Sequence, residues 1–428
     1  MTPKRLGSAP LAASGAKCDV LIVGGGIAGL SSAYFLARAG VDVVLVEAAA
    51  ALGTHSTGQN AAILRTLIAD PLLTAIGRNG AAFLQHPPAG FTSGPLIDPV
   101  GLLLTADKGR VGDFETWLAA AGSAPYPECA AEPITKRDAR RRAPFLAHPD
   151  DAAFAPDEPV GVWMPGEGHI DIAALVAAFA KGATAPGPDG RPARILSSAP
   201  LDSLVMAGGS VAGGRLRDGR RIDCARVLFT GGAWAEVLAR DAGSPLRFAP
   251  RRRHLVVTVP PNPKHPVDPR WPIVWNHSQA PGRSFYARPE SPGLLICACD
   301  ETELAPAGRP DEVSCPPDAA CLEDVARAAA TFLPDFADAG VHSWWAGWRT
   351  FPTGSQVHGG HFAIGADPVV DGLFWAAGLG GHGMTSSFEV GRLAAHALAA
   401  DLKHAHHATL VGPDYDGAFR PRPAEVAN

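Results

Sequence analysis

The chain has 428 residues, a formal net charge of −5, an apolar fraction of 46% and a charged fraction of 18%. This length exceeds the roughly 250–300 residues that one hydrophobic core can organise, so we expect two domains. The slight negative charge, without a basic stripe, argues against nucleic acid as a partner.

The N-terminal segment and the cysteines indicate a cytoplasmic protein. MTPKRLGSAPLAASGAK has only a short apolar patch, so we interpret residues 1–15 as a flexible leader and not as a signal peptide. No apolar run reaches the roughly 18–20 residues that cross a bilayer, so no transmembrane segment is expected. The seven cysteines are scattered without a CxxC pair, which favours reduced thiols and argues against a metal site.

The first elements form a strand, a glycine turn and a helix typical of dinucleotide binding. The apolar run Val20–Val23 precedes Gly24, Gly26 and Gly29, and an apolar helix is expected over Ile27–Ala39. In such a fold the first glycine makes the tight turn, the second lets the backbone approach a pyrophosphate, and the third allows close helix packing. The free N–H groups at the start of the helix favour the phosphates.

Glu47 ends the second apolar strand, eighteen residues after Gly29. A carboxylate at this position can accept hydrogen bonds from ribose hydroxyls. Strand, glycines, helix, strand and acid in register predict a dinucleotide site, but they leave NAD and FAD equally open.

Helices and strands alternate through the middle of the chain. A polar loop, GTHSTGQN at 53–60, precedes an expected helix over 61–85, and HPPAGFTSG at 86–94 breaks that helix. A buried strand is expected at Val100–Leu104. Residues 107–165 combine charged helices with proline-rich turns.

The next segments predict a capped helix and paired strands. Asp171 precedes an apolar-periodic helix within 168–179 and is expected as its N-cap. Hairpin-like strands are expected at 201–205 and 211–222, joined by glycine turns. The run RVLFTGGAW at 226–234 predicts another buried strand that ends at glycines.

The last third of the chain predicts two isolated strands and a return to the cofactor. Strands are expected at Leu255–Val259 and Leu294–Cys299, with Cys315 and Cys321 in a proline-rich loop. Residues 372–398 predict a strand, a glycine loop and a long helix. The polar residues 412–428 are expected to form a flexible tail.

With these pieces in view, the chain resembles the FAD-dependent oxidoreductases of the D-amino-acid oxidase and glycine oxidase superfamily. The resemblance covers nearly the whole chain and is carried by VGGGIAGLSSAYFLARAG, HSTGQNAA, RVLFTGGAWA, WWAGWRTFPTG, AIGADP and GLFWAAGLGGHGMTSS. Within the superfamily it is most similar to the flavin-dependent D-arginine dehydrogenases, through GTHSTGQNAA, HPPAGF, PRRR, SFY, WAGWR and GGHGM in matching order.

The resemblance implies an α/β fold whose Rossmann-like FAD-binding domain is built from non-contiguous segments, with a second α+β domain of mixed sheet. We therefore expect residues 16–90, 165–245 and 346–405 to form the FAD-binding domain. Residues 91–164 and 246–345 are expected to form the substrate-binding domain.

The resemblance also implies four residues that meet the substrate. Arg349 and Arg253 match family arginines that bind the substrate carboxylate, and Tyr286 matches a tyrosine that assists them. His382 lies in a glycine loop expected near the flavin and the substrate. The alternatives are a buried ion pair for Arg349, a solvated basic turn for Arg253, core packing for Tyr286, and loop support for His382.

The cofactor site implied by the resemblance combines three regions. The glycine turn and Glu47 are expected at the adenosine end, while the loop after the second strand meets the phosphates and ring edge or caps a helix. The C-terminal glycine loop passes the other end of the flavin. The expected residues are Gly24, Gly26, Ile27, Ala28, Gly29, Glu47, Ser56, Thr57, Gly58, Asn60, Gly232, Gly380, Gly381, Gly383, Met384 and Thr385.

The pocket departs from the D-arginine dehydrogenases. Leu102 stands where they carry an acidic residue that recognises the basic side chain. Ile63, Leu64 and Ile68 replace polar positions, Arg65 replaces a threonine, and Ile273 and Trp275 add bulk. A desolvated cation without a partner costs several kcal/mol, so arginine and lysine are not expected as substrates. An apolar, aromatic or small side chain fits better, and Arg65 pairing with an acidic side chain is a weaker option.

We hypothesise that FAD, bound without covalent attachment, oxidises the Cα–N bond of an amino acid or related amine. Hydride transfer to flavin N5 would give an imine, which hydrolyses to a keto acid. The partner is therefore a small molecule, and the electron acceptor stays open. An NAD-dependent dehydrogenase and a non-catalytic flavoprotein assembly or interaction factor are the alternatives.

Overall fold

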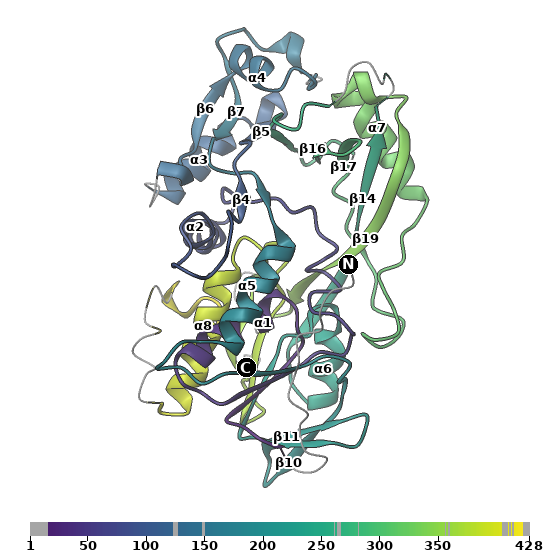
Figure 1. Ribbon diagram of the computed structural model, residues 1–428. Helices are drawn as coiled ribbons and strands as arrows, with labels where there is room; N and C mark the ends of the chain where they lie inside the picture. Colours follow the sequence, from purple (N-terminus) through teal and green to yellow (C-terminus); the bar gives the residue numbers. More distant parts are fainter. Residues whose placement is uncertain are drawn as a thin grey trace, which may run out of the picture.

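The computed structural model describes residues 16–122, 127–147, 150–260, 262, 267–280, 282–355, 357, 360–404, 410, 412 and 415–422. Two large sheets dominate it (Figure 1). The first is six-stranded, with the order β20-β21-β13-β2-β3-β9. Its strands are β2 (Val20–Val23), β3 (Val43–Val46), β9 (Arg194–Leu196), β13 (Arg226–Phe229), β20 (Ala363–Ala366) and β21 (Leu373–Ala377).

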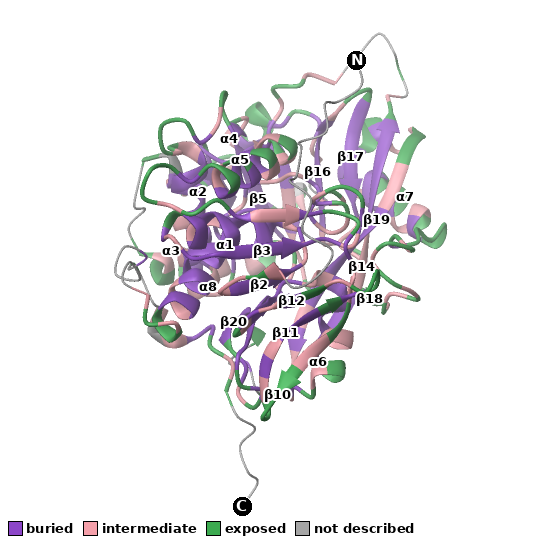
Figure 2. Cartoon of the chain, turned by 60° about the horizontal axis from the view of Figure 1, so that its bottom comes forward, coloured by how far each residue is buried: buried purple, intermediate pink, exposed green. Residues whose placement is uncertain are grey.

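All neighbouring strands of this sheet run parallel except β20, which pairs antiparallel with β21. Runs such as VLIV and VVLV are apolar on both faces, as strands covered on both sides require. Val20 and Ile22 pack toward one core, and Leu21 and Val23 pack toward another. Figure 2 shows these strands buried at the centre of the molecule.

Helices cover one face of the six-stranded sheet. They are α1 (Ile27–Arg38), α2 (Pro71–Gln85), α5 (Ile172–Thr184) and α8 (Ser387–Asp401). The carboxylate of Asp171 accepts a hydrogen bond of 2.8 Å from the N–H of Ala174, which confirms the N-cap of α5.

The helix expected from residue 61 begins only at Pro71, so its first ten residues were predicted wrongly. Asp70 caps α2 through Leu73 N–H at 2.9 Å, and Pro71 occupies the first turn, where its missing N–H costs nothing. Residues 59–70 instead form an irregular segment. Ala62 there has a φ of 55°, which no α-helix contains.

A four-stranded sheet lies against the opposite face, at the bottom of Figure 1. Its order is β1-β12-β11-β10, and α6 (Ala235–Ala242) follows β13 beside it. The hairpin predicted here is confirmed, because the two longest strands pair antiparallel around Gly208 and Gly209. The strands are β1 (Ala16–Lys17), β10 (Leu201–Ala207), β11 (Ser210–Leu216) and β12 (Arg221–Asp223).

The second large sheet has nine strands and forms the upper part of Figure 1. It contains β5 (Leu102–Ala106), β6 (Glu132–Thr135), β7 (Pro159–Met164), β14 (Arg247–Val259), β15 (Ile273–His277), β16 (Phe285–Glu290), β17 (Gly293–Cys297), β18 (Thr302–Glu303) and β19 (Gly340–Thr353). Helices α3 (Gly112–Ala121), α4 (Lys136–Arg142) and α7 (Ala320–Phe332) accompany it. A two-stranded ribbon, β4 (Ile97–Asp98) with β8 (His169–Ile170), completes the sheets.

Two expectations for this region need correction. The arginine triplet 251–253 lies inside β14 and not before it, because β14 pairs with β19 along almost its whole length. Cys321 lies in α7 and not in a loop.

Residues 415–422 differ from the flexible tail that was expected. Phe419 is 2% exposed and stacks on Phe362, while the Tyr415 hydroxyl accepts a 2.7 Å hydrogen bond from the Asn79 amide. Aromatic contacts therefore hold this part of the C-terminal segment on the protein.

The predicted α/β fold, with its parallel dinucleotide-type sheet and a separate mixed sheet, is confirmed. The division into domains stays a prediction. All six strands of the parallel-type sheet lie in the segments assigned to the FAD-binding domain, and only β19 crosses an expected boundary. No helix among the described residues is long and apolar enough to cross a membrane.

Candidate active site

A cavity of about 800 Å³ lies at the carboxyl ends of the parallel strands. Its lining includes the residues that follow β2, β3, β13 and β21, namely Gly24, Glu47, Thr230 and Gly378. This edge is where open parallel sheets bind ligands. The volume falls in the upper part of the roughly 300–1,000 Å³ range of small-molecule sites, as a large cofactor requires.

The glycine turn is held by contacts that no larger residue would allow. Gly24 has a φ of 114°, and a Cβ there would lie 2.7 Å from the carbonyl oxygen of Thr230. A Cβ on Gly29 would lie 2.0 Å from the carbonyl oxygen of Gly24. A Cβ on Gly26 would meet only the Thr57 hydroxyl, at 3.3 Å. The absence of a side chain at Gly29 therefore lets α1 pack directly against the Gly24 carbonyl. The absence of a side chain at Gly26 leaves the backbone there open toward the cavity.

Glu47 and Thr57 brace this turn. The Glu47 carboxylate is buried and accepts hydrogen bonds from Gly25 N–H at 2.6 Å and Ala49 N–H at 2.8 Å. The Thr57 hydroxyl accepts one from Ile27 N–H at 3.0 Å, at the start of α1. Both side chains also line the cavity, so each can hold the turn and still meet a nucleotide.

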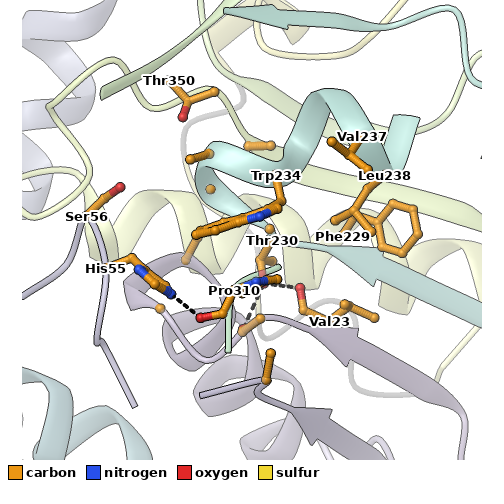
Figure 3. A pocket seen from close by; sticks show the side chains of 18 of the residues that line it. Val23, His55, Ser56, Phe229, Thr230, Trp234, Val237, Leu238, Pro310 and Thr350 are labelled. Atoms are coloured by element: carbon orange, nitrogen blue, oxygen red, sulfur yellow. Dashed lines mark hydrogen bonds between the residues drawn. The ribbon is translucent and has the colours of Figure 1, made fainter. Parts of the chain in front are cut away.

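One wall of the cavity is aromatic (Figure 3). The His55 and Trp234 rings lie 4.6 Å apart, and Trp348 packs against Trp234 at 5.2 Å. His55 Nε2 contacts the carbonyl oxygen of Pro310 at 2.8 Å, while its Nδ1 is buried and has no hydrogen-bond partner among the described residues. Within the same part of the chain, the buried Thr350 hydroxyl of the lining also has none. Both atoms can therefore bind a cofactor.

Most of the residues expected to bind the cofactor line this one cavity. They are Gly24, Gly26, Ile27, Ala28, Glu47, Ser56, Thr57, Asn60, Gly232, Gly380, Gly381, Gly383 and Met384. Gly29, Gly58 and Thr385 lie outside the lining. Gly29 and Gly58 are packed against the carbonyl groups of Gly24 and Gly53, and Thr385 lies against α2.

Arg349 lies deep in the same cavity, at the part reached by β19. It is 6% exposed, and its guanidinium donates only to the carbonyl oxygens of Trp348 at 3.0 Å and Gln59 at 3.2 Å. Burial lowers its pKa from the ordinary value. No carboxylate of the described residues forms an ion pair with it, so the buried-ion-pair alternative has no partner in that part of the chain.

The other candidate substrate residues share one face of the nine-stranded sheet. The pairings Trp275↔Tyr286 and Tyr286↔Cys297 run across β15, β16 and β17. On β14 and β19, Arg253 pairs with Gly347 and Arg251 with Arg349. Because side chains alternate along a strand, Arg253 and Arg349 lie on the same face. The irregular segment 59–70 contacts this sheet through two hydrogen bonds. Arg288 donates to the Ala61 carbonyl, and Arg349 donates to the Gln59 carbonyl.

Arg253 is partly neutralised. Its Nη2 forms an ion pair with Glu301, whose other oxygen lies 2.9 Å from Arg251, and its Nε donates to the Asp300 carbonyl at 3.3 Å. Burial opposes its charge, but the neighbouring Cys299, Cys297, Tyr286 and Glu301 groups outweigh burial and raise its pKa. Arg253 therefore has fewer free donors than Arg349.

Tyr286 and His382 lie beside these arginines. Tyr286 is 2% exposed, and burial raises the pKa of its hydroxyl, so it remains a hydrogen-bond donor. Burial, with the charges of Arg65 and Arg253, lowers the pKa of His382 to about 4. The imidazole is thus neutral at pH 7. Its backbone supports the loop through Leu379 and Ser386.

The expected pocket residues fall into two groups. Leu102 and Ile273 are fully buried and lie on the same sheet face as Trp275, in a core that Ile63 and Trp275 also contact. Ile63 and Trp275 keep partial exposure at the junction of two cores. None of the four lines the large cavity described above, so they stay predictions for a neighbouring substrate space.

Some cavity residues were not expected from the sequence. His55 stands in the HSTGQN motif, which is a signal that could have identified it. Trp234 lies in the RVLFTGGAWA motif, and Trp348 and Thr350 lie in WWAGWRTFPTG, so the same signal could have identified them. The segment Pro306–Asp311 carries no such signal, and only the fold brings it to the cavity.

The residues present suit FAD. One cavity is large enough for a dinucleotide. It is surrounded by the glycine turn, the start of α1 capped by Thr57, the aromatic wall and the C-terminal glycine loop. No group of three or more potential metal ligands occurs within the part of the chain that the structure describes.

Comparison with known proteins agrees with this geometry. Residues 19–397 match the family model "FAD dependent oxidoreductase" (DAO). The chain is 24% identical over 436 residues to FAD-dependent oxidoreductase domain-containing protein 1 of Bos taurus, covering 92% of this chain and 83% of that protein. It is 22% identical over 373 residues to glycine oxidase of Bacillus licheniformis, covering 84% and 87%.

Solved structures show the same fold. The L-proline dehydrogenase of P. horikoshii superposes with a TM-score of 0.73 at 20% identity, covering 90% of this chain and 94% of that one. The family match confirms FAD as the cofactor, in place of NAD, and an FAD-dependent oxidoreductase. The closer likeness to D-arginine dehydrogenases stays a prediction. The chain belongs to the DAO family of FAD-dependent oxidoreductases, within the D-amino-acid oxidase and glycine oxidase superfamily.

Proposed function

We propose that this enzyme oxidises the Cα–N bond of an amino acid or related amine whose carboxylate is bound by Arg349. In this reaction a hydride leaves Cα and a proton leaves the nitrogen, and a C=N bond forms. Water then adds to the imine and releases a keto acid and the amine. FAD, when bound, supplies the two-electron oxidant.

Arg349 carries the proposal. A buried guanidinium without an acidic partner is costly unless a ligand supplies the negative charge. Its planar donors match a carboxylate in two parallel hydrogen bonds, which fixes the orientation of the substrate as well as its charge. Arg349 lines the cofactor cavity, so a carboxylate bound to it would lie beside the cofactor site.

The surrounding residues would complete the orientation. Tyr286 can donate its hydroxyl proton to the same carboxylate, and Arg253 adds a second cation on the same sheet face. His382 is neutral, so it can accept a hydrogen bond from a water molecule that takes the proton of the amine. Positioning accounts for most of the catalysis contributed by the chain.

Arginine and lysine are not proposed as substrates. Leu102 and Ile273 offer no charge, Arg65 and Arg253 act electrostatically on His382, and Arg349 lines the cofactor cavity. A basic side chain would add a further positive charge there. The electron acceptor stays open between oxygen, a quinone and other carriers.

Replacement of Arg349 tests the proposal. Purified protein is first checked for released flavin, and anaerobic bleaching then identifies reducing substrates among D- and L-amino acids, N-methyl amino acids and imino acids. Arg349→Gln should lower kcat/KM on the reducing substrate by about 30-fold or more, because one partner of a buried charge pair is lost. Arg349→Lys should retain part of the kcat/KM that Arg349→Gln loses.

The exposed Arg270, paired with Asp268, provides the matched control Arg270→Gln, which should retain full activity. Unchanged kcat/KM in Arg349→Gln with full flavin content would overturn the assignment. A yellow protein that no amine reduces would instead favour a non-catalytic flavoprotein.

A further inference from the structure

Arg65 is a second cation of the candidate site, and its side chain is half-buried. It lies in the irregular segment 59–70, and its Nε donates to the carbonyl oxygen of Leu67 at 3.2 Å. Its guanidinium carbon lies 4.1 Å from the centre of the Trp275 ring. Among the described residues, no carboxylate forms an ion pair with it. Stacking on Trp275 fixes the plane of the guanidinium and leaves its outer N–H donors unused.

Glu167 is the acidic group whose charge acts on Arg65, but it is engaged elsewhere. Its Oε1 accepts from Thr66 N–H at 2.6 Å and from the Thr66 hydroxyl at 2.5 Å. Burial raises the pKa of Glu167 to about 7, so at neutral pH it carries only part of a negative charge. It therefore offsets the charge of Arg65 only in part.

Arg65 acts on the same space as the proposed carboxylate site. Trp275, on which it stacks, lies 4.5 Å from the Tyr286 ring, and Arg349 in turn acts electrostatically on Tyr286. Arg65 and Arg253 both lower the pKa of His382. The Arg65 side chain keeps intermediate solvent accessibility, so a ligand can reach it.

The charges in this space do not balance. Glu301 pairs with Arg253 and also with Arg251, whereas no carboxylate of the described residues forms an ion pair with Arg65 or Arg349. Burial and, after it, the charge of Arg253 lower the pKa of both Arg65 and Arg349, and one substrate carboxylate neutralises only one of these two cations. A second negative charge beside Arg65 is therefore favoured.

We propose that Arg65 binds a second carboxylate of the substrate, so that the preferred substrate is an amine with two carboxylates. This inference rests on the proposed oxidation of a Cα–N bond and names its substrate class. The second carboxylate is carried either by the side chain, as in an acidic amino acid, or by an N-carboxyalkyl group. Arg349 holds the carboxylate on the reacting carbon, and Arg65 holds the distant one.

Matched substrate pairs test the inference on the flavin-loaded enzyme. Each diacid is compared with its own amide: aspartate with asparagine and glutamate with glutamine, in both D and L forms, and iminodiacetate with its monoamide. The measurement is kcat/KM from anaerobic flavin bleaching. For at least one diacid, kcat/KM should exceed that of its amide by about 30-fold or more. Preference for aspartate or glutamate would indicate a side-chain carboxylate, and preference for iminodiacetate an N-linked one.

Replacement of Arg65 provides the second arm. Arg65→Met keeps the length and the apolar contact with Trp275 but removes the charge, so the diacid-to-amide ratio of kcat/KM should collapse toward one. Arg65→Lys should restore part of the ratio. The exposed Arg137, 66% accessible in its side chain, gives the control Arg137→Met, which should leave the ratio as in the unmodified enzyme.

The outcomes separate the two proposals. Reduction by amides or monocarboxylic amino acids as fast as by diacids overturns the role of Arg65 and leaves the amine oxidation intact. A ratio that is unchanged in Arg65→Met also overturns it. Failure of every amine to reduce the flavin overturns the proposed function itself.

Discussion

Individual side chains give the candidate site its electrostatic character. The carboxylate of Glu301 binds both Arg251 and Arg253, whereas no described carboxylate pairs with Arg349 or Arg65, which contact backbone carbonyls and, for Arg65, the Trp275 ring. Burial, with a smaller effect of the charges of Arg65 and Arg253, keeps His382 neutral. The site is therefore arranged to attract anions and to resist protonation of its histidine.

The low pKa of His382 predicts a contribution to acid sensitivity. Its pKa is about 4 in the folded protein and about 6.5 in an unfolded chain, so between these values the unfolded state binds the additional proton. The free energy of unfolding therefore falls as pH drops from about 6.5 to 4, by at most about 1.4 kcal/mol per pH unit for one group. Glu167, whose pKa is raised, acts in the opposite direction.

The variant His382→Asn isolates this contribution. Its free energy of unfolding should decline less steeply than that of the unmodified protein between pH 6.5 and 4.5, as measured by urea unfolding at several pH values. Parallel curves for the two proteins would show that the imidazole is not held neutral by the fold.

At the scale of elements, the close approach of α1 to the sheet positions the start of that helix at the cavity. Gly29 allows this approach on one side. On the other, a Cβ at Gly391 of α8 would lie 2.5 Å from the backbone carbon of Ser31. Small residues at these contacts let two helices and a sheet pack with their backbones nearly touching.

Gly29→Ala should therefore impair cofactor binding. The added methyl group would overlap the Gly24 carbonyl, and relief of that overlap displaces α1 from the turn at a cost of about 1–3 kcal/mol. We expect reduced flavin per protein and a lower Tm, measured by absorbance and by thermal unfolding. Gly94→Ala is the matched control, since a Cβ there meets nothing within 4 Å. Equal flavin content in both variants would contradict the argument.

The local parts of the fold could be predicted from the sequence, because their signals lie within a few dozen residues. The unit from β2 to Glu47, the N-cap at Asp171 and the C-terminal return loop are examples. The start of α2 was missed because the apolar pattern of residues 61–70 resembles a helix, while their real partners are distant strands.

The site was predictable in part for the same reason. The cofactor residues belong to motifs, so their convergence on one cavity could be anticipated. The stacking of Arg65 on Trp275 joins residues more than two hundred positions apart, and no local pattern encodes it. Both residues can be singled out in the sequence, but no sequence pattern indicates that they contact each other.

At the scale of the whole molecule, the cofactor cavity gathers segments from every third of the chain. Residues from the glycine turn, from the region around Trp234, from Pro306–Asp311 and from the C-terminal loop all line it. A ligand that contacts all of these segments stabilises their packing against one another, so its removal should lower the stability of the whole protein.

Removal of FAD should lower Tm, and added FAD should restore it in proportion to its concentration. A ligand that binds only the folded state stabilises it by about 2.7 kcal/mol at a hundred times its Kd. Thermal unfolding of apoprotein with graded FAD measures this effect, and NAD serves as the control. A Tm that is the same with and without FAD would contradict the position of the cofactor site.

The strands β14 and β19 have one more consequence, which concerns access. They pair from Arg247 with Thr353 to Val259 with Gly340, and Pro352 of this ribbon packs against Gly378 of the cofactor loop. A continuous ribbon of this length is stiff, so it opposes a hinge rotation of one half of the molecule against the other. Entry of substrate and exit of product should then depend on movements of the short connecting segments around the cavity, and turnover on how fast those segments open.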